Sequence, residues 1–93
     1  MVVGVLTLEL YLGEADSLKG KRKVLKSLLE RLKQRFNVSA AEVGRQESWH
    51  YATVGISAVS GETAHMQQTL DTVTRFVESH NGVEVLEINR ELL

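Results

Sequence analysis

The sequence predicts an α+β fold with the element order β-α-β-β-α-β, and three observations predict it. Apolar residues recur with a period of two in residues 2–12 and 51–59, as they do in half-buried strands. They recur at helical spacing in residues 17–36. No proline, low-complexity run or Gly/Ser linker interrupts the 93 residues, so tight turns join the elements. A chain of this length fits one compact domain, residues 1–93.

The first strand and the first helix follow from these periods. One face of the strand over residues 2–12 carries Val2, Leu6, Leu8, Leu10 and Leu12. The segment G-E-A-D-S then turns the chain, and the side chain of Asp16 or Ser17 can accept a hydrogen bond from a free backbone N–H and begin a helix. We expect this helix to run to about Phe36. The apolar stripe that faces the sheet consists of Leu18, Leu25, Leu28, Leu29, Leu32 and Phe36.

The rest of the chain supplies three further strands and a second helix. V-S-A-A-E-V forms a strand that ends at Gly44, the loop of residues 45–50 follows, and residues 51–59 form the next strand. S-G-E-T begins a helix that ends near Asn81 and Gly82, because these residues tolerate a left-handed backbone. The last strand is V-E-V-L-E-I-N-R-E-L-L. Two β-α-β halves with right-handed crossovers give a ferredoxin-like fold, a four-stranded antiparallel sheet with two helices on one face.

The basic residues are concentrated in the first predicted helix. Residues 16–36 hold eight of the eleven Lys and Arg residues and two acids, a net charge of +6, while the rest of the chain carries −7. At about 100° per residue, one arc beside the apolar stripe holds a group that we call the basic ridge: Lys19, Arg22, Lys23, Lys26 and Lys33. Arg31 and Arg35 lie on the other flank of the stripe. Such a ridge can contact the phosphates of a nucleic acid. The alternative, a solvated helix face whose aliphatic stems cover the core edge, stays open.

The residue types that carry chemistry in enzymes form no recognisable site in this sequence. There is no cysteine, which excludes thiolate ligands and a cysteine nucleophile. His50, His65 and His80 lie in different predicted elements, which argues against a metal site. The segment from Gly13 to Lys21 lacks the glycine spacing of a phosphate-binding loop, and no serine lies in a nucleophile turn. We therefore expect no catalytic residues, no metal, no cofactor and no small-molecule substrate.

One face of the predicted sheet is not covered by helices. We expect it to carry Val3, Val5, Tyr11, Tyr51 and Val59, with Val83 and Val85 from the last strand. The first five are a predicted oligomer interface, because an uncovered face rich in Val and Tyr favours self-association, most simply as a homodimer. Two tyrosines are too few aromatic residues to predict stacking of RNA bases. Trp49 is either a lid on the core or an anchor in an interface.

Two stretches of the chain resemble a known family. They are S-L-K-G-K-R-K-V-L-K-S-L-L-E-R-L-K-Q-R-F-N-V-S-A-A-E-V, from Ser17 to Val43, and W-x-x-A-x-x-G-I-S-x-V-S, from Trp49. Both resemble the YlxP-like family of small bacterial proteins, classed as domain of unknown function 503, and the resemblance extends over nearly the whole chain. It implies the ferredoxin-like fold and a bacterial cytoplasmic protein. Genes of that family often neighbour those of translation-initiation and ribosome-maturation factors, which implies association with RNA or the ribosome. The family supplies no activity and no site residues.

These observations lead to two hypotheses for function. The first is a non-enzymatic accessory module that binds structured RNA or a ribonucleoprotein through the basic ridge. The second is a protein-interaction or oligomeric module that uses the open sheet face. The apolar N-terminal segment has no basic leader, and Glu9 interrupts it far short of the length of a membrane span. We therefore expect a cytoplasmic protein without membrane association.

Overall fold

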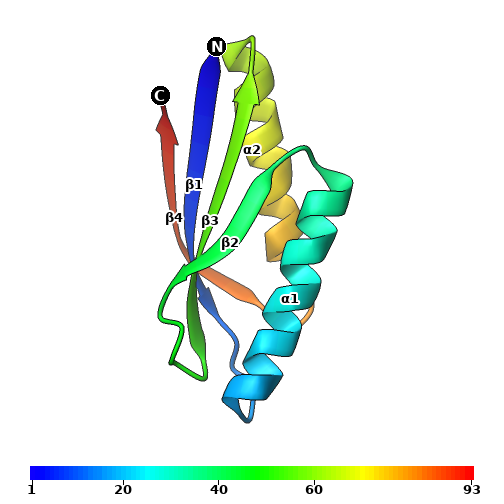
Figure 1. Cartoon of the computed structure of the whole chain (residues 1–93), viewed down its shortest axis with the longest axis vertical. Helices are drawn as coiled ribbons and strands as arrows, with labels where there is room; N and C mark the ends of the chain where they lie inside the picture. Colours follow the sequence, from blue (N-terminus) through cyan, green and yellow to red (C-terminus); the bar gives the residue numbers. More distant parts are fainter.

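The chain folds into a four-stranded sheet with two α-helices packed on one face (Figure 1). The computed structural model describes residues 1–93. Its elements are β1 (Val2–Tyr11), α1 (Leu18–Arg35), β2 (Ser39–Gly44), β3 (Tyr51–Ser60), α2 (Thr63–Glu78) and β4 (Glu84–Leu92). The strand order across the sheet is β2-β3-β1-β4, and each neighbouring pair is antiparallel. This architecture confirms the predicted ferredoxin-like fold.

The core lies between the sheet and the two helices. Alternate residues of β1 and β3 face the helices and are buried: Leu6, Leu8, Leu10, Ala52, Val54 and Ile56. The helices contribute Leu25, Leu28, Leu32, Met66, Leu70, Val73 and Val77. Burial of one such leucine contributes about 1.5–3 kcal/mol to stability. A Cβ on Gly4 would overlap the side chain of Met66, so the glycine allows α2 to lie close on β1.

The ends of α1 are set by its local sequence. Ser17 has an extended backbone, and its Oγ accepts a hydrogen bond from the N–H of Gly20 at 2.9 Å. The helix ends at Arg35, where Lys33 and Arg35 place positive charge at the negative end of the helix dipole. Neither helix is long and apolar enough to cross a lipid bilayer. The capping serine and the apolar stripe together account for the helix that carries the basic residues.

A β-bulge in β4 overturns one prediction. β4 pairs Glu87 with Glu9, and Val85 with the next residue of β1, which leaves Leu86 without a partner on that strand. One extra residue reverses the face that alternate side chains take. The prediction that Val83 and Val85 lie on the open sheet face is therefore wrong, because both pack against the core.

A second bulge lies in β2, at Val43. Glu42 lies opposite Val54, whose side chain faces the helices, while Gly44 lies opposite Thr53 on the other face. The regular alternation of β2 puts Glu42 on the same side as Ala40, which faces α1, and the extra residue Val43 follows it. β2 therefore presents a carboxylate to the helix that carries the basic residues.

Candidate nucleic-acid interface

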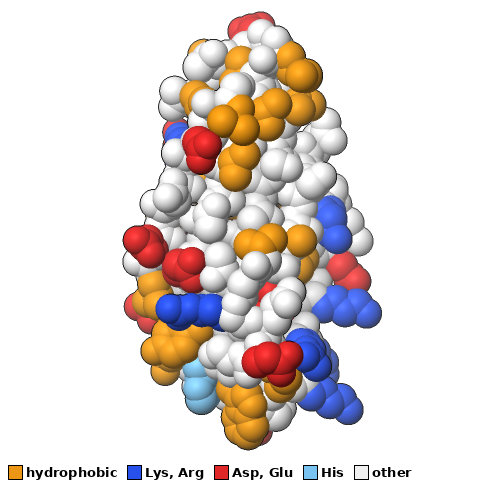
Figure 2. Space-filling model, turned by 60° about the vertical axis from the view of Figure 1, so that its left-hand side comes forward, with side chains coloured by type: hydrophobic (Ala, Val, Ile, Leu, Met, Phe, Trp, Pro, Cys, Tyr) orange, Lys and Arg blue, Asp and Glu red, His pale blue; other side chains and the backbone are white.

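The basic ridge is exposed along α1. All five of its side chains face the solvent, while Leu25, Leu28 and Leu32 on the opposite side of the helix are buried against the sheet. The space-filling view shows Lys and Arg side chains along the right-hand edge of the lower half of the molecule, on the side where α1 lies, with Asp and Glu side chains beside them (Figure 2). The helical phase thus places the ridge on the surface as predicted. That it binds a nucleic acid stays a prediction.

The ridge residues form no ion pair and no side-chain hydrogen bond within the protein. The ion pairs of the chain are Lys21 with Glu42, Arg45 with Glu9, and Arg90 with Asp71. Within α1 the only carboxylate is Glu30, and it is exposed. Glu30 and Glu42 lie beside the ridge without contacting its side chains, so five basic residues face two carboxylates and the ridge keeps a net positive charge that can attract an anionic partner.

The ridge borders two depressions in the surface. One, of about 240 Å³, lies between α1 and β2, and its charged lining residues are Arg22, Lys26, Lys33, Glu30 and Glu42. The other, of about 420 Å³, lies between α1 and the end of α2 and is lined by Lys23 and Arg31. The sequence placed Arg31 on the far flank of the apolar stripe, and the second helix brings it into one groove with a ridge residue. The basic surface thus continues around α1 beyond the predicted ridge.

Lys21 is the basic residue of α1 that does not face the solvent. Its side chain is fully buried, and Nζ donates a hydrogen bond to the backbone oxygen of Arg45 at 2.7 Å. Nζ also lies 3.1 Å from Oε2 of Glu42, which has no partner in hydrogen-bonding geometry, so attraction between charges holds this contact. The sequence interpretation missed Lys21, although its place four residues before Leu25 puts it on the apolar stripe. Lys21 fastens the first turn of α1 to β2 and the loop that follows.

Because Glu42 pairs with Lys21, it does not form an ion pair with the ridge residues. Glu42 lines the same depression as Arg22, Lys26 and Lys33, yet its ion pair is with Lys21. A pair shielded from water interacts more strongly than charges separated by solvent. The negative charge of Glu42 is therefore balanced inside the protein rather than by the ridge.

A polar network lies on the open sheet face, near the end where β1 finishes and β3 begins. Arg45 has a φ of 58°, in the left-handed region that few residues other than glycine adopt. Its guanidinium lies over the ring of Tyr51, 5.1 Å from the centroid, and its Nε lies 3.9 Å from Oε1 of Glu9. The same Oε1 accepts a hydrogen bond from Thr53 Oγ1 at 2.7 Å. These contacts hold the loop of residues 45–50 against one end of the face.

The open face also carries the five residues predicted for an oligomer interface. β1 and β3 place Val3 opposite Val59 and Tyr11 opposite Tyr51, with Val5 between these pairs. Val59 is 59% exposed and Tyr51 39%. Hydrophobic side chains gather toward the upper end of this view, where β1 begins and β3 ends (Figure 2). Their place on the uncovered face is as predicted, and their role in an interface stays a prediction.

Trp49 does not cover the core. Its side chain is 52% exposed, so the interpretation as a core lid is wrong. Leu12 is buried at this end of the core, and its N–H donates a hydrogen bond to the backbone oxygen of His50 at 2.7 Å. Because the leucine already closes the core, the indole is left at the surface, where it is available to a partner.

The three histidines do not converge. No group of three or more His, Asp and Glu side chains is arranged to hold a metal ion. Partial burial lowers the pKa of His80 below its ordinary value of 6.5, and the positive charge of Arg31 lowers it further. The imidazole of His80 is therefore neutral at pH 7 and lies beside the basic surface of α1.

The chain is similar to proteins whose function is not known. The sequence model of a family described as "Protein of unknown function (DUF503)" matches residues 3–90. The chain is 37% identical over 83 residues to "Uncharacterized protein YlxP" of Bacillus subtilis (strain 168), which covers 89% of this chain and 90% of that protein. Among solved structures it is similar to "De novo designed protein Foldit4", with a TM-score of 0.55 at 16% identity over 100% of this chain and 97% of the other. That likeness concerns the fold alone.

Proposed function

The chain belongs to the DUF503 family of proteins of unknown function, and from this premise we propose that it is a non-enzymatic accessory module that binds structured RNA or a ribonucleoprotein. The basic ridge of α1 contacts the phosphates. One observation carries the proposal: the five ridge side chains are exposed and unpaired on a chain whose net charge is −1. We place this activity in the cytoplasm, on the ribosome or other translation-associated RNA, as the family resemblance implies.

The ridge has the length and chemistry of a phosphate-contacting surface. Lys33 lies 14 residues after Lys19, which corresponds to about 21 Å of helix axis, enough to follow several successive phosphates. Lysine and arginine side chains reach phosphate oxygens without reading the bases. Recognition of this kind depends on the shape of a folded RNA rather than on its sequence, which favours a structured RNA as the partner.

The sheet face supports base stacking less well than the ridge supports phosphate contacts. RNA-binding sheets of this topology present two or three aromatic side chains on which bases stack. Here Tyr11 and Tyr51 lie against each other with centroids 5.4 Å apart, and the guanidinium of Arg45 already lies over Tyr51. Both tyrosines are thus engaged with neighbouring side chains. This supports binding through α1 in preference to the sheet.

The salt dependence of binding tests the proposal. Five phosphate contacts predict a slope of about −3.5 to −4.5 in a plot of log affinity against log salt concentration. Raising KCl from about 50 to about 200 mM should therefore weaken binding to a ribosomal RNA hairpin on the order of a hundredfold. Fluorescence anisotropy with a labelled hairpin measures both quantities. A slope near zero, or no binding at the lowest salt concentration, would rule out the ridge as an RNA-binding surface.

A second candidate function is a protein-interaction or oligomeric module that uses the open sheet face. The observation that favours it is the exposure of Val59 and Tyr51 on a face that no element of the chain covers. An antiparallel sheet leaves one face to water readily only when that face is polar, and this one is mixed. A homodimer through the sheet faces would place the two α1 helices on outer surfaces. The two functions are therefore compatible.

If the chain dimerises through this face, Val5→Lys should convert the dimer to a monomer. Val5 lies between the Val3–Val59 and Tyr11–Tyr51 pairs, and a charge buried there without a partner opposes association. Light scattering at high micromolar concentration measures the mass, and circular dichroism checks that the helices persist. Gln67→Lys, on the exposed side of α2, is the matched control and should leave the dimer intact. A wild-type chain that stays monomeric would exclude the dimer.

A further inference from the structure

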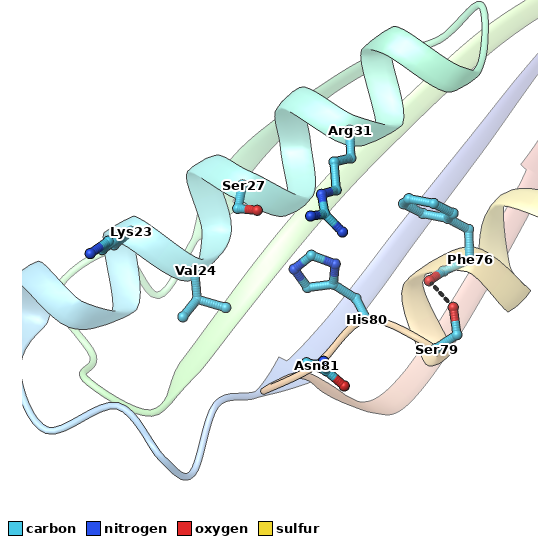
Figure 3. Close-up of a pocket in the computed structure, with 8 residues that line it drawn as sticks. All are labelled: Lys23, Val24, Ser27, Arg31, Phe76, Ser79, His80 and Asn81. Carbon is cyan, nitrogen blue, oxygen red and sulfur yellow. Dashed lines mark hydrogen bonds between the residues drawn. The ribbon is translucent and has the colours of Figure 1, made fainter.

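A groove between α1 and the end of α2 brings basic and polar side chains together without a carboxylate (Figure 3). Its volume is about 420 Å³, and its lining includes Lys23, Ser27, Arg31, Phe76, His80 and Asn81. None of the lining residues is acidic. The groove therefore combines a positive potential with a concave shape and, unlike the depression between α1 and β2, has no carboxylate in its lining.

Arg31 and His80 face each other across this groove. The guanidinium of Arg31 points toward the imidazole of His80 (Figure 3), and no ion pair engages either side chain. His80 is partly buried, while Arg31 extends into the opening from α1. A guanidinium and an imidazole that can gain a proton repel each other at this position unless an anion lies between them. Their convergence is the arrangement that a bound anion would stabilise.

We propose that this groove binds a single phosphate group between Arg31 and His80. The planar guanidinium can donate two parallel hydrogen bonds to phosphate oxygens, and the imidazole can donate a third. Ser27 lies on the same wall of the groove and can supply a hydroxyl group, while Lys23, whose side chain points away from His80 (Figure 3), adds only a more distant positive charge. The phosphate is either a phosphodiester of an RNA that also contacts the ridge or part of a free phosphate compound. The site goes beyond the proposed function because it can bind phosphate with or without RNA on the ridge.

Phosphate binding at this site is coupled to protonation of His80. Without an anion, burial and the charge of Arg31 keep the pKa of His80 below 6.5. The charged group that faces the imidazole is Arg31 from α1, whereas Lys23 lines the groove farther along with its side chain pointing away from His80 (Figure 3), and neither α2 nor the turn after it contributes a carboxylate to the groove. A bound phosphate favours the imidazolium form and raises the pKa of His80. By linkage, the phosphodiester affinity should rise as the pH falls from about 7.5 toward about 6.

The pKa of His80, followed by NMR through its ring C–H signals, tests the site directly. Saturating inorganic phosphate should raise this pKa by at least about half a unit relative to KCl of the same ionic strength. Arg31→Gln should raise the pKa of His80 in KCl, because one of the two effects that lower it is removed. In this variant phosphate should no longer shift the pKa. If His80 has only a structural role, Arg31→Gln should still raise its pKa in KCl, but phosphate should not shift the pKa of His80 in either protein.

Two further measurements are needed. One distinguishes an RNA phosphodiester from a free phosphate compound as the ligand, and the other distinguishes failure of the groove proposal from failure of the ridge proposal. A response to an RNA duplex but not to inorganic phosphate assigns the site to a phosphodiester, and a response to inorganic phosphate assigns it to free phosphate compounds as well. A variant with Lys19, Lys26 and Lys33 changed to Gln should keep the response to inorganic phosphate, even though it weakens RNA binding. If neither probe shifts the signals of His80 while RNA still binds with the predicted salt slope, the groove is not a phosphate site and the ridge proposal survives.

Discussion

Replacing Lys21 with methionine is expected to lower the free energy of unfolding by about 3 kcal/mol. Methionine preserves most of the aliphatic volume, so the loss comes from the charge and its hydrogen bond. Without Nζ, the backbone oxygen of Arg45 loses the hydrogen-bond donor 2.7 Å away, and Oε2 of Glu42 loses the positive charge 3.1 Å away. Removing one partner of a buried pair typically costs about 3–5 kcal/mol, and the 17% exposure of Glu42 favours the low end. For a chain of 93 residues the melting temperature should fall by about 15 °C.

Urea unfolding of three matched variants checks this expectation. Lys23→Met removes an exposed, unpaired charge two residues away in the same helix and should change the free energy of unfolding by less than about 0.5 kcal/mol. Lys21→Met combined with Glu42→Leu should recover most of the loss, because an apolar pair of similar volume leaves no uncompensated charge. Equal stability of Lys21→Met and Lys23→Met would show that the buried pair does not hold α1 to β2.

The element order could be predicted because its signals are local. The alternation in β1 and β3 and the serine at the start of α1 each depend on residues that are neighbours in the chain. The bulges at Val43 and Leu86 could not be predicted in this way. Each depends on which residue of the neighbouring strand is its partner, and a period-two pattern contains no information about that. A single extra residue was enough to move Val85 from the expected open face to the core side.

The candidate sites also differ in whether they depend on local sequence or on contacts between distant elements. The basic ridge follows from helical phase alone, so its exposure could be predicted from the spacing of five residues. The groove that joins Arg31 to His80 exists only because α2 ends beside α1, and the two residues lie far apart in the sequence. Lys21 was missed because lysine is almost never fully buried unless it is paired, and its partner Glu42 lies on another element.

The buried pair and the ridge are linked through Glu42. This carboxylate lines the depression beside Arg22, Lys26 and Lys33, and Lys21 balances its charge. In Lys21→Met the carboxylate would be free to attract the ridge side chains instead. We therefore expect that variant to bind RNA more weakly at temperatures where it is still folded, and adding Glu42→Leu should restore binding together with stability.

Changing Lys19, Lys26 and Lys33 together to glutamine is expected to remove most of the affinity for structured RNA. Each lost phosphate contact reduces the magnitude of the salt slope by about 0.7–0.9, so the three changes should reduce it by about 2–3. Because release of one counterion favours binding about tenfold near 50 mM salt, the affinity there should fall on the order of a thousandfold. The three side chains are exposed and form no ion pair, so the fold should keep its stability. Anisotropy titrations with the labelled hairpin measure the slope and the affinity.

A matched control separates the position of the charges from the net charge. Changing Ala64, Gln67 and Gln68 to glutamate gives the same net charge of −4, three below the −1 of the chain, through exposed positions of α2. Binding through the ridge predicts that this control keeps its salt slope and loses only the small affinity that long-range repulsion removes, because screening limits that repulsion to about 10 Å at 0.1 M salt. If the two variants lose affinity equally, the attraction comes from the overall charge of the protein. In that case α1 is a solvated helix face, and a functional partner must be sought on the open side of the sheet.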